Sequence, residues 1–153
     1  MSKKDAEIGN MMKAALMTVL IVDDDPMIRN IVVQNLKTIG FQKFLEAANG
    51  SDAHKFILDP LQSVDLIICD WEMPKTDGLT FLRAVRSHRT RSAVPFIMVT
   101  SQQSQERMKI TKAAQHEVSA YIVKPFRAET LRQKVFQVLF DALEKATDKK
   151  AGA

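Results

Sequence analysis

The chain has 153 residues, 46% of them hydrophobic and 26% charged, which is enough for one domain with a buried core. Its net charge is +4, and no apolar run approaches the ~20 residues of a membrane span, so we do not expect a membrane protein. Cys69 is the only cysteine, which excludes an intramolecular disulfide and fits a reducing cytoplasm.

Five short apolar runs alternate with longer amphipathic segments. The runs are rich in Val, Ile and Leu, as buried parallel strands are. They cover residues 17–22, 43–47, 65–69, 95–100 and 120–123. The first, third and fourth runs are almost entirely apolar, so we expect them in the centre of a sheet. The second run carries Lys43 and Glu46 and is expected at an edge.

Between these runs, apolar residues recur at helical spacing. Asp25 and Pro26 predict the N-cap and first turn of one helix, Ser51 is expected to cap the next, and Asp77 to open a third. A more polar helix is expected over residues 103–115, and a last one over residues 127–143. The alternation predicts an α/β fold in which helices cover both faces of a doubly wound parallel sheet.

The positive charge lies at the ends of the chain and in one internal cluster. We expect the terminal lysines to lie in frayed ends; they are Lys3, Lys4, Lys13, Lys149 and Lys150. The internal cluster comprises Arg83, Arg86, His88, Arg89 and Arg91. Its simplest interpretation is a solvated helix end and loop. The alternative is a nucleotide-binding module in which the Arg83–Arg91 cluster grips phosphates.

Polar side chains fall where the apolar runs end. Asp23 and Asp24 follow the first run, Asp70 the third, and Lys124 the fifth, while Thr100 closes the fourth. Because the carboxyl ends of parallel strands lie side by side, these groups are expected to converge on one crevice. Carboxylates so close either gain protons or need a cation, and oxygen ligands suit Mg²⁺. With a lysine and a hydroxyl nearby, the set fits an aspartate that carries a phosphoryl group.

Four stretches match a known family in combination and order. They are residues 19–24 with Arg29, 70–74 with Asp77 and Gly78, 99–101, and 121–126. In these stretches the chain resembles the receiver domain of two-component response regulators, and most of all its single-domain, CheY-like members. The resemblance implies a flavodoxin-like (βα)5 fold with strand order 2-1-3-4-5. It divides the chain into an N-terminal extension (1–16), a receiver domain (17–145) and a disordered tail (146–153).

The resemblance also implies a role for each matching site residue. Asp70 would be the phosphoacceptor. Asp24 and the backbone carbonyl of Glu72 would bind Mg²⁺ together with Asp70, and Asp23 would act largely through water. Lys124 would pair with the phosphoryl group.

Switching is implied by two further matches. Thr100 would be drawn to the phosphoryl group, and Tyr121 would move inward behind it, with the Lys124–Pro125 peptide expected to be cis. Such a protein is a phosphoacceptor switch supplied by a histidine kinase. It would assist its own phosphorylation and dephosphorylation but would not be a metabolic enzyme.

The expected output surface consists of the helix over residues 103–115, the strand over 120–123 and the last helix. Its candidate contact residues are Tyr121, Val123, Phe126 and Phe140. Phe140 falls away from the apolar stripe of the last helix, so we predict that it is mostly exposed to solvent in the monomer and belongs to a dimer or partner interface. With no DNA-binding domain after Leu143, DNA is an unlikely target. A flagellar motor switch protein is expected as the partner, or alternatively a histidine phosphotransfer protein in a phosphorelay.

Overall fold

The computed structural model describes residues 2–101 and 117–141 and contains a five-stranded parallel sheet. The strands are β1 (Thr18–Val22), β2 (Lys43–Ala47), β3 (Leu66–Asp70), β4 (Phe96–Thr100) and β5 (Ala120–Val123). They lie in the order β2-β1-β3-β4-β5, which confirms the predicted topology. Each predicted run agrees with its strand to within one residue at either end, and β2 lies at an edge as expected.

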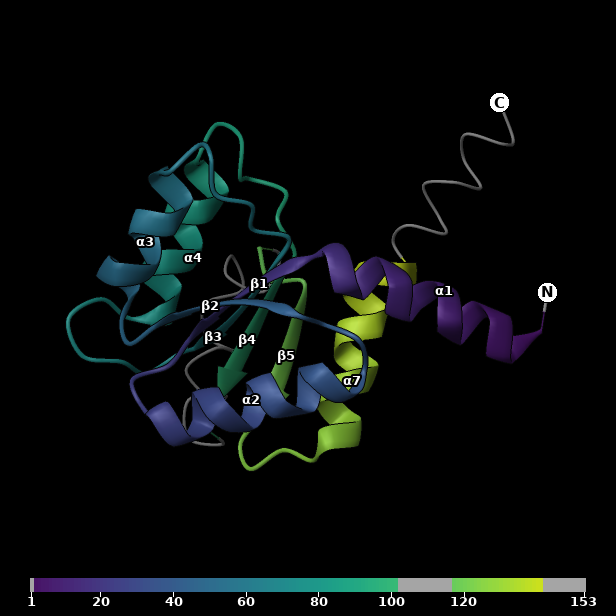
Figure 1. The fold of residues 1–153 in the computed structure, drawn as a ribbon. Coiled ribbons are helices and arrows are strands. Elements are labelled where there is room, and N and C mark those ends of the chain that lie inside the picture. The colour runs from purple at the N-terminus through teal and green to yellow at the C-terminus, as the bar shows by residue number, and fades with distance from the viewer. Residues whose placement is uncertain (1, 102–116, 142–153) are drawn as a thin grey trace.

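Helices cover both faces of this sheet (Figure 1). The described helices are α1 (Lys3–Leu16), α2 (Pro26–Thr38), α3 (Gly50–Leu58), α4 (Gly78–Ser87), α7 (Ala128–Phe136) and the π-helical turn η1 (Gln137–Asp141). Alternate strand residues feed two buried apolar clusters. We name them the α2/α7 cluster, which includes Ile21, Leu36 and Val135, and the α3/α4 cluster, which includes Leu20, Ile57 and Leu82. Among the described helices, none is long and apolar enough to cross a bilayer.

Helix starts follow local side-chain chemistry. Asp25 accepts a hydrogen bond from the backbone N–H of Met27, and Asp77 accepts one from Thr80, so both predicted caps are confirmed. The cap of α3 was predicted wrongly. Asn49, not Ser51, accepts the bond from the first turn, because the helix already begins at Gly50.

The N-terminal segment forms a regular helix, so the expectation of a frayed end is wrong for Lys3, Lys4 and Lys13. A capping box of Ser2 and Asp5 starts α1, and Ala14 is fully buried in the α2/α7 cluster. Lys149, Lys150, the helix predicted over residues 103–115 and the tail predicted over 146–153 lie outside the described residues. The predicted domain boundaries stay predictions.

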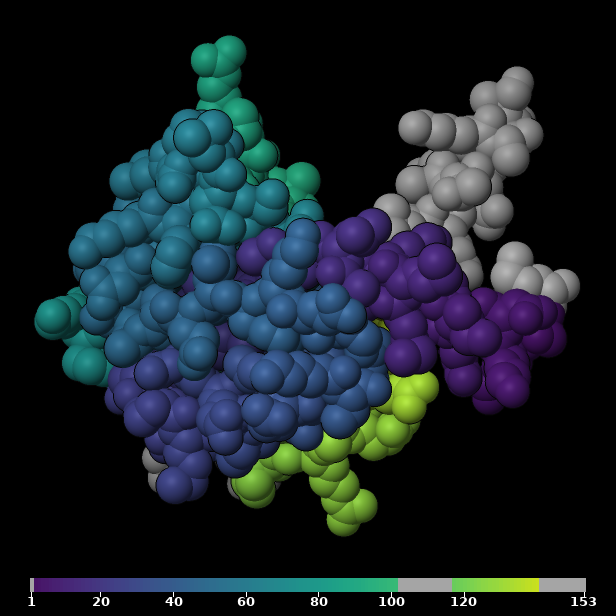
Figure 2. All heavy atoms as spheres, in the orientation of Figure 1, coloured from purple at the N-terminus to yellow at the C-terminus, as the bar shows by residue number. Residues whose placement is uncertain are grey.

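The prediction that Phe140 is exposed is wrong, because only 5% of its surface is accessible. A regular α-helix was assumed, but the chain widens into the π-helical turn η1, which changes the direction of the side chains. Phe140 packs against Phe136 with ring centroids 5.2 Å apart and shares the α2/α7 cluster with Ala14 of α1. Figure 2 shows α1 in purple beside the yellow-green C-terminal segment. A partner contact through Phe140 is therefore withdrawn.

Candidate functional site

Three carboxylates meet at the carboxyl ends of β1 and β3. Suitable oxygens of Asp23, Asp24 and Asp70 all lie within 4.8 Å of one another. Asp23 and Asp70 are buried, whereas Asp24 is exposed. The convergence expected from parallel strand ends is thus observed, and it produces an acidic pocket that opens to solvent at Asp24.

Asp23 uses both of its carboxylate oxygens within the protein. Oδ1 accepts a hydrogen bond of 2.9 Å from the backbone N–H of Asp25, and Oδ2 accepts one of 3.0 Å from the Lys124 ammonium. Asp24 and Asp70 are therefore better placed than Asp23 to offer oxygens directly to a cation.

Lys124 supplies the counter-charge of the pocket. Its Nζ is also 3.4 Å from Asp70 Oδ1, and its backbone N–H donates to the carbonyl of Thr100 at 2.7 Å. The Lys124–Pro125 peptide is cis, as expected. Burial by itself would lower the pKa of Lys124, but the hydrogen bond that it donates to Asp23 and the negative charge of Asp70 outweigh this effect and raise the pKa above its ordinary value. The lysine stays a cation.

Asp70 shows the electrostatic cost of the cluster. Burial and the negative charge of Asp23 raise the pKa of Asp70 from 3.8 to about 6, although Lys124 acts in the opposite direction. Three carboxylates facing one ammonium leave an excess of negative charge. A hard cation bound by oxygens fits this donor set, since it neutralises charge that the protein alone does not.

Thr100 and Tyr121 lie on adjacent strands beside the pocket. Thr100 is fully buried, and its hydroxyl donates a 2.9 Å hydrogen bond to the carbonyl of Ser101. Thr100 pairs with Val123, so Tyr121, two residues earlier on β5, faces the same side of the sheet as Thr100. Tyr121 packs partly buried against the α3/α4 cluster, and burial raises its pKa.

The other predicted contact residues are more dispersed. Phe126 packs against the α2/α7 cluster and Tyr121 against the α3/α4 cluster, so the two aromatic rings belong to opposite sides of the sheet. Val123 is half-buried, and Glu72, two residues after Asp70, is exposed.

Two arginines of the Arg83–Arg91 cluster tie loops together. Arg86 donates to the backbone carbonyls of Glu117 at 2.7 Å, Ser92 at 3.1 Å and Val94 at 2.7 Å. Arg91 donates to the carbonyls of Asp59 and Gln62. Because the guanidinium groups of Arg86 and Arg91 are committed to backbone carbonyls, these two arginines are poorly suited to grip nucleotide phosphates.

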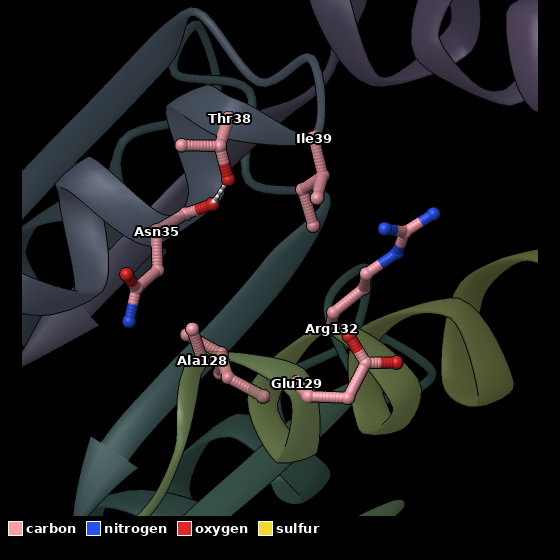
Figure 3. Close-up of a pocket in the computed structure, with 7 residues that line it drawn as sticks. Asn35, Thr38, Ile39, Ala128, Glu129 and Arg132 are labelled. Carbon is pink, nitrogen blue, oxygen red and sulfur yellow. Dashed lines mark hydrogen bonds between the residues drawn. The ribbon is translucent and has the colours of Figure 1, made fainter.

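A hollow of 230 Å³ between α2 and α7 lies away from the carboxylates. Figure 3 shows it with Thr38 donating a 2.6 Å hydrogen bond to the carbonyl of Asn35. Its walls are Asn35, Thr38, Ile39, Ala128, Glu129, Leu131 and Arg132. None of the predicted phosphoacceptor, cation or switch residues lines it, so we place the functional site at the acidic pocket.

Sequence reasoning missed the part played by Gly78. A Cβ atom at this position would lie 2.4 Å from the carbonyl oxygen of Asp70 and 3.0 Å from the Cα of Trp71. The N–H of Gly78 donates to the carbonyl of Trp71 at 2.9 Å. The Asp77–Gly78 pair predicted a helix cap, but nothing in the sequence showed that the backbone of Asp70 lies against this glycine.

Comparisons with known proteins agree with this geometry. A family model described as the response regulator receiver domain matches residues 19–136. The chain is 37% identical over 124 residues to chemotaxis protein CheY of Pseudomonas aeruginosa, covering 80% of this chain and 95% of that protein. It is 34% identical over 123 residues to chemotaxis protein CheY1 of Helicobacter pylori, covering 80% and 97%.

Solved structures give the same result. Chemotaxis response regulator CheY4 of Vibrio cholerae superposes with a TM-score of 0.70 at 33% identity, over 80% of this chain and 98% of that one. A CheY-like receiver domain protein of Methanospirillum hungatei gives a TM-score of 0.71 at 30% identity, over 86% and 98%. The flavodoxin-like fold with strand order 2-1-3-4-5 is thereby confirmed.

Proposed function

Since this chain belongs to the response regulator receiver domain family and is CheY-like, we propose that it is a switch whose Asp70 accepts a phosphoryl group from a histidine kinase. The observation that carries the proposal is the acidic pocket itself. Three carboxylates gather within 4.8 Å, and the Lys124 ammonium lies 3.4 Å from Asp70 Oδ1. A phosphoryl group formed on Asp70 is then within reach of that ammonium.

The residues fit Mg²⁺ as the cation. Asp24, Asp70 and the backbone carbonyl of Glu72 would hold it, with Asp23 acting through water. When bound, the ion supplies positive charge that neutralises phosphoryl oxygens and offsets their repulsion by the acceptor. The raised pKa of Asp70 supports the proposal: burial and the negative charge of Asp23 disfavour its ionised form, and a cation bound beside it would favour that form.

Phosphoryl transfer then needs positioning more than acid–base chemistry. An oxygen of the ionised Asp70 attacks phosphorus in line with the donor imidazole. The P–N bond breaks, and its electron pair returns to the imidazole nitrogen. Lys124 neutralises the phosphoryl oxygens from the side of β5.

Switching follows from the bond that Thr100 makes before phosphorylation. The hydroxyl of Thr100 leaves the carbonyl of Ser101 and donates to a phosphoryl oxygen instead. Tyr121, which faces the same side of the sheet, repacks toward the vacated space and alters the surface around β5. This is a shift between two packings, driven by their different interactions with the phosphoryl group.

The output is proposed to be a protein contact in the cytoplasm, centred on Tyr121 and Val123. The named relatives are chemotaxis proteins, which supports a flagellar motor switch protein as the partner. The protein assists its own phosphorylation and dephosphorylation and converts no metabolite.

The acceptor is tested by incubating the protein with acetyl phosphate and Mg²⁺ and measuring its mass. We expect wild type and the control Asp59→Asn, an exposed carboxylate elsewhere, to gain one phosphoryl group, and Asp70→Asn to gain none. A phosphoryl mass on the Asp70→Asn variant would overturn the assignment of the acceptor.

The partner is tested with beryllofluoride-treated protein as bait, against untreated protein and against treated Asp70→Asn. Enrichment of a flagellar motor switch protein by the treated wild type alone is the expected result. Enrichment of a histidine phosphotransfer protein would select a phosphorelay role instead.

A further inference from the structure

Arg29 on α2 bridges the acidic pocket and the edge of the sheet. Its Nη1 donates a 2.6 Å hydrogen bond to the backbone carbonyl of Asp23, and its Nε donates a 3.1 Å bond to Glu46 Oε1. The side chain of Arg29 is 18% exposed and that of Glu46 49%. Glu46 belongs to β2, where it pairs with Ile21 of β1. One guanidinium thus connects α2, the loop after β1, and β2.

The carbonyl that Arg29 contacts is part of the peptide group joining Asp23 to Asp24. Because a peptide group is planar, fixing its oxygen also fixes the backbone from which the Asp24 carboxylate departs. The backbone just before this peptide group is already held, since the N–H of Asp23 donates to the carbonyl of Ala47 at 3.1 Å. Arg29 adds the restraint on the Asp24 side, where the carboxylate is exposed.

Glu46 gives the guanidinium a second, fixed acceptor. A cation beside three carboxylates is attracted to them and would compete with a metal ion for Asp24. The bond to Glu46 instead aligns the planar fork, so that one edge meets Glu46 and the other the Asp23 carbonyl. A lysine ammonium is a point charge and does not reproduce this fork.

We infer that Arg29 is a positioning residue for the cation site, and that Glu46 keeps Arg29 in that role. The inference rests on the proposed Mg²⁺ site, but its evidence is the pair of bonds from one guanidinium. According to this inference, Arg29 and Glu46 lie outside the acidic pocket but determine the orientation of Asp24 inside it.

Substitutions of Arg29 distinguish a positioning role from a simple charge effect, because the two roles predict opposite changes in Mg²⁺ affinity for Arg29→Gln. If Arg29 acted only as a nearby positive charge, Arg29→Gln would strengthen Mg²⁺ binding and Arg29→Lys would leave it unchanged. Positioning predicts that both variants bind Mg²⁺ more weakly, by about tenfold, the usual effect of removing a group that orients a metal ligand. Lys37→Gln, an exposed charge farther along α2, is the matched control and should bind as wild type does.

Glu46→Ala, which removes the acceptor of the Arg29 Nε–H bond, tests the second half of the inference through a double-mutant cycle. Alone it should weaken Mg²⁺ binding by several-fold, since Arg29 loses its anchor. Combined with Arg29→Gln it should add no further loss, because the residue it orients is gone. If the substitution at Glu46 weakened Mg²⁺ binding equally with and without Arg29, Glu46 would act only through its charge. The inference that Glu46 holds Arg29 in position would then be rejected.

Binding is measured on the unphosphorylated protein, by the fluorescence of Trp71, the only tryptophan, and by titration calorimetry. Acetyl phosphate reactions across a range of Mg²⁺ concentrations provide a second measurement. The Arg29 variants should need about tenfold more Mg²⁺ for half-maximal rate yet reach a similar maximal rate. Variants that bind Mg²⁺ as tightly as wild type, or more tightly, overturn the inference while leaving the proposed function intact. A wild-type protein that binds no Mg²⁺ overturns both.

Discussion

The ammonium of Lys124 lies 3.0 Å from Asp23 Oδ2 and joins the ends of β5 and β1, which are not neighbours in the sheet. The same ammonium is 3.4 Å from Asp70. It is the positive charge shared by two buried carboxylates, and the stability of the acidic pocket depends on it.

Lys124→Met should therefore destabilise the protein when divalent ions are absent. The two buried carboxylates would face each other without a counter-charge, and we expect the free energy of unfolding to fall by about 1–3 kcal/mol. Urea denaturation in EDTA measures the loss. Saturating Mg²⁺ should restore more stability to the variant than to wild type. An unchanged unfolding free energy in EDTA would show that Lys124 does not stabilise the protein by neutralising these carboxylates.

Asp70→Asn should stabilise the protein in EDTA at neutral pH. The pKa of Asp70 is raised from 3.8 to about 6, so its ionised form opposes folding. That cost is absent below pH 3.8 and develops as pH rises through about 6, reaching about 1–3 kcal/mol at pH 8.

The measurement is the difference in unfolding free energy between Asp70→Asn and wild type at pH 4.5 and at pH 8. Groups common to both proteins cancel in this difference. A stabilisation larger at pH 8 than at pH 4.5 is expected. A difference that shrinks as pH rises would mean that burial and Asp23 do not raise the pKa of Asp70.

Gly78→Ala should displace the backbone of Asp70, the proposed phosphoacceptor. Its Cβ would lie 2.4 Å from the carbonyl oxygen of Asp70, a distance that forces the backbone to move. We expect a loss of stability of about 1–3 kcal/mol and slower phosphorylation by acetyl phosphate. Gly9→Ala is the control: beyond its chain neighbours and the adjacent backbone of its own helix, no atom lies within 4 Å of its added Cβ, and alanine in a helix interior should stabilise by about 0.5–1 kcal/mol. Equal phosphorylation rates in the two variants would contradict the proposed contact.

Ala14→Asp should detach α1 from the body of the protein. Ala14 is fully buried in the cluster that also contains Phe140. Burying an unpaired carboxylate there costs more free energy than the burial of α1 contributes to stability. We expect lower thermal stability, together with binding of an apolar dye as Phe136 and Phe140 lose cover. Met12→Asp, on the exposed side of α1, should behave as wild type. Identical dye binding by the two variants would mean that α1 does not protect these rings.

The strands and the carboxylate pocket could be predicted because both follow from local pattern. Buried parallel strands are short apolar runs, and the polar residues that follow them must meet at one edge of the sheet. Asp23, Asp70 and Lys124 were found in this way from their places after three such runs. The caps at Asp25 and Asp77 were also readable, since the residue that caps a helix precedes it in sequence.

Close packing between distant segments was not readable in the same way. Whether α1 docks depends on Ala14 and on the Gly40 turn, where φ is +114° and a Cβ atom would lie 3.0 Å from the backbone of Met11. The burial of Phe140 depends on the π-helical turn η1 and on α1 together. No periodic pattern in the sequence indicates either contact, because each joins surfaces that meet only after folding.

The sequence by itself determined which functional group stands at the end of each strand. The positions of the carboxylates, the hydroxyl and the ammonium after their apolar runs are properties of the chain. Only the tertiary structure decided which of these groups are held and by what. In the folded protein, the two carboxylate oxygens of Asp23 accept hydrogen bonds from Asp25 and Lys124. Arg29 donates to both the Asp23 carbonyl and Glu46. Hydrogen bonds act over about 3 Å, and the partners at that distance are fixed by packing in three dimensions rather than by spacing along the chain.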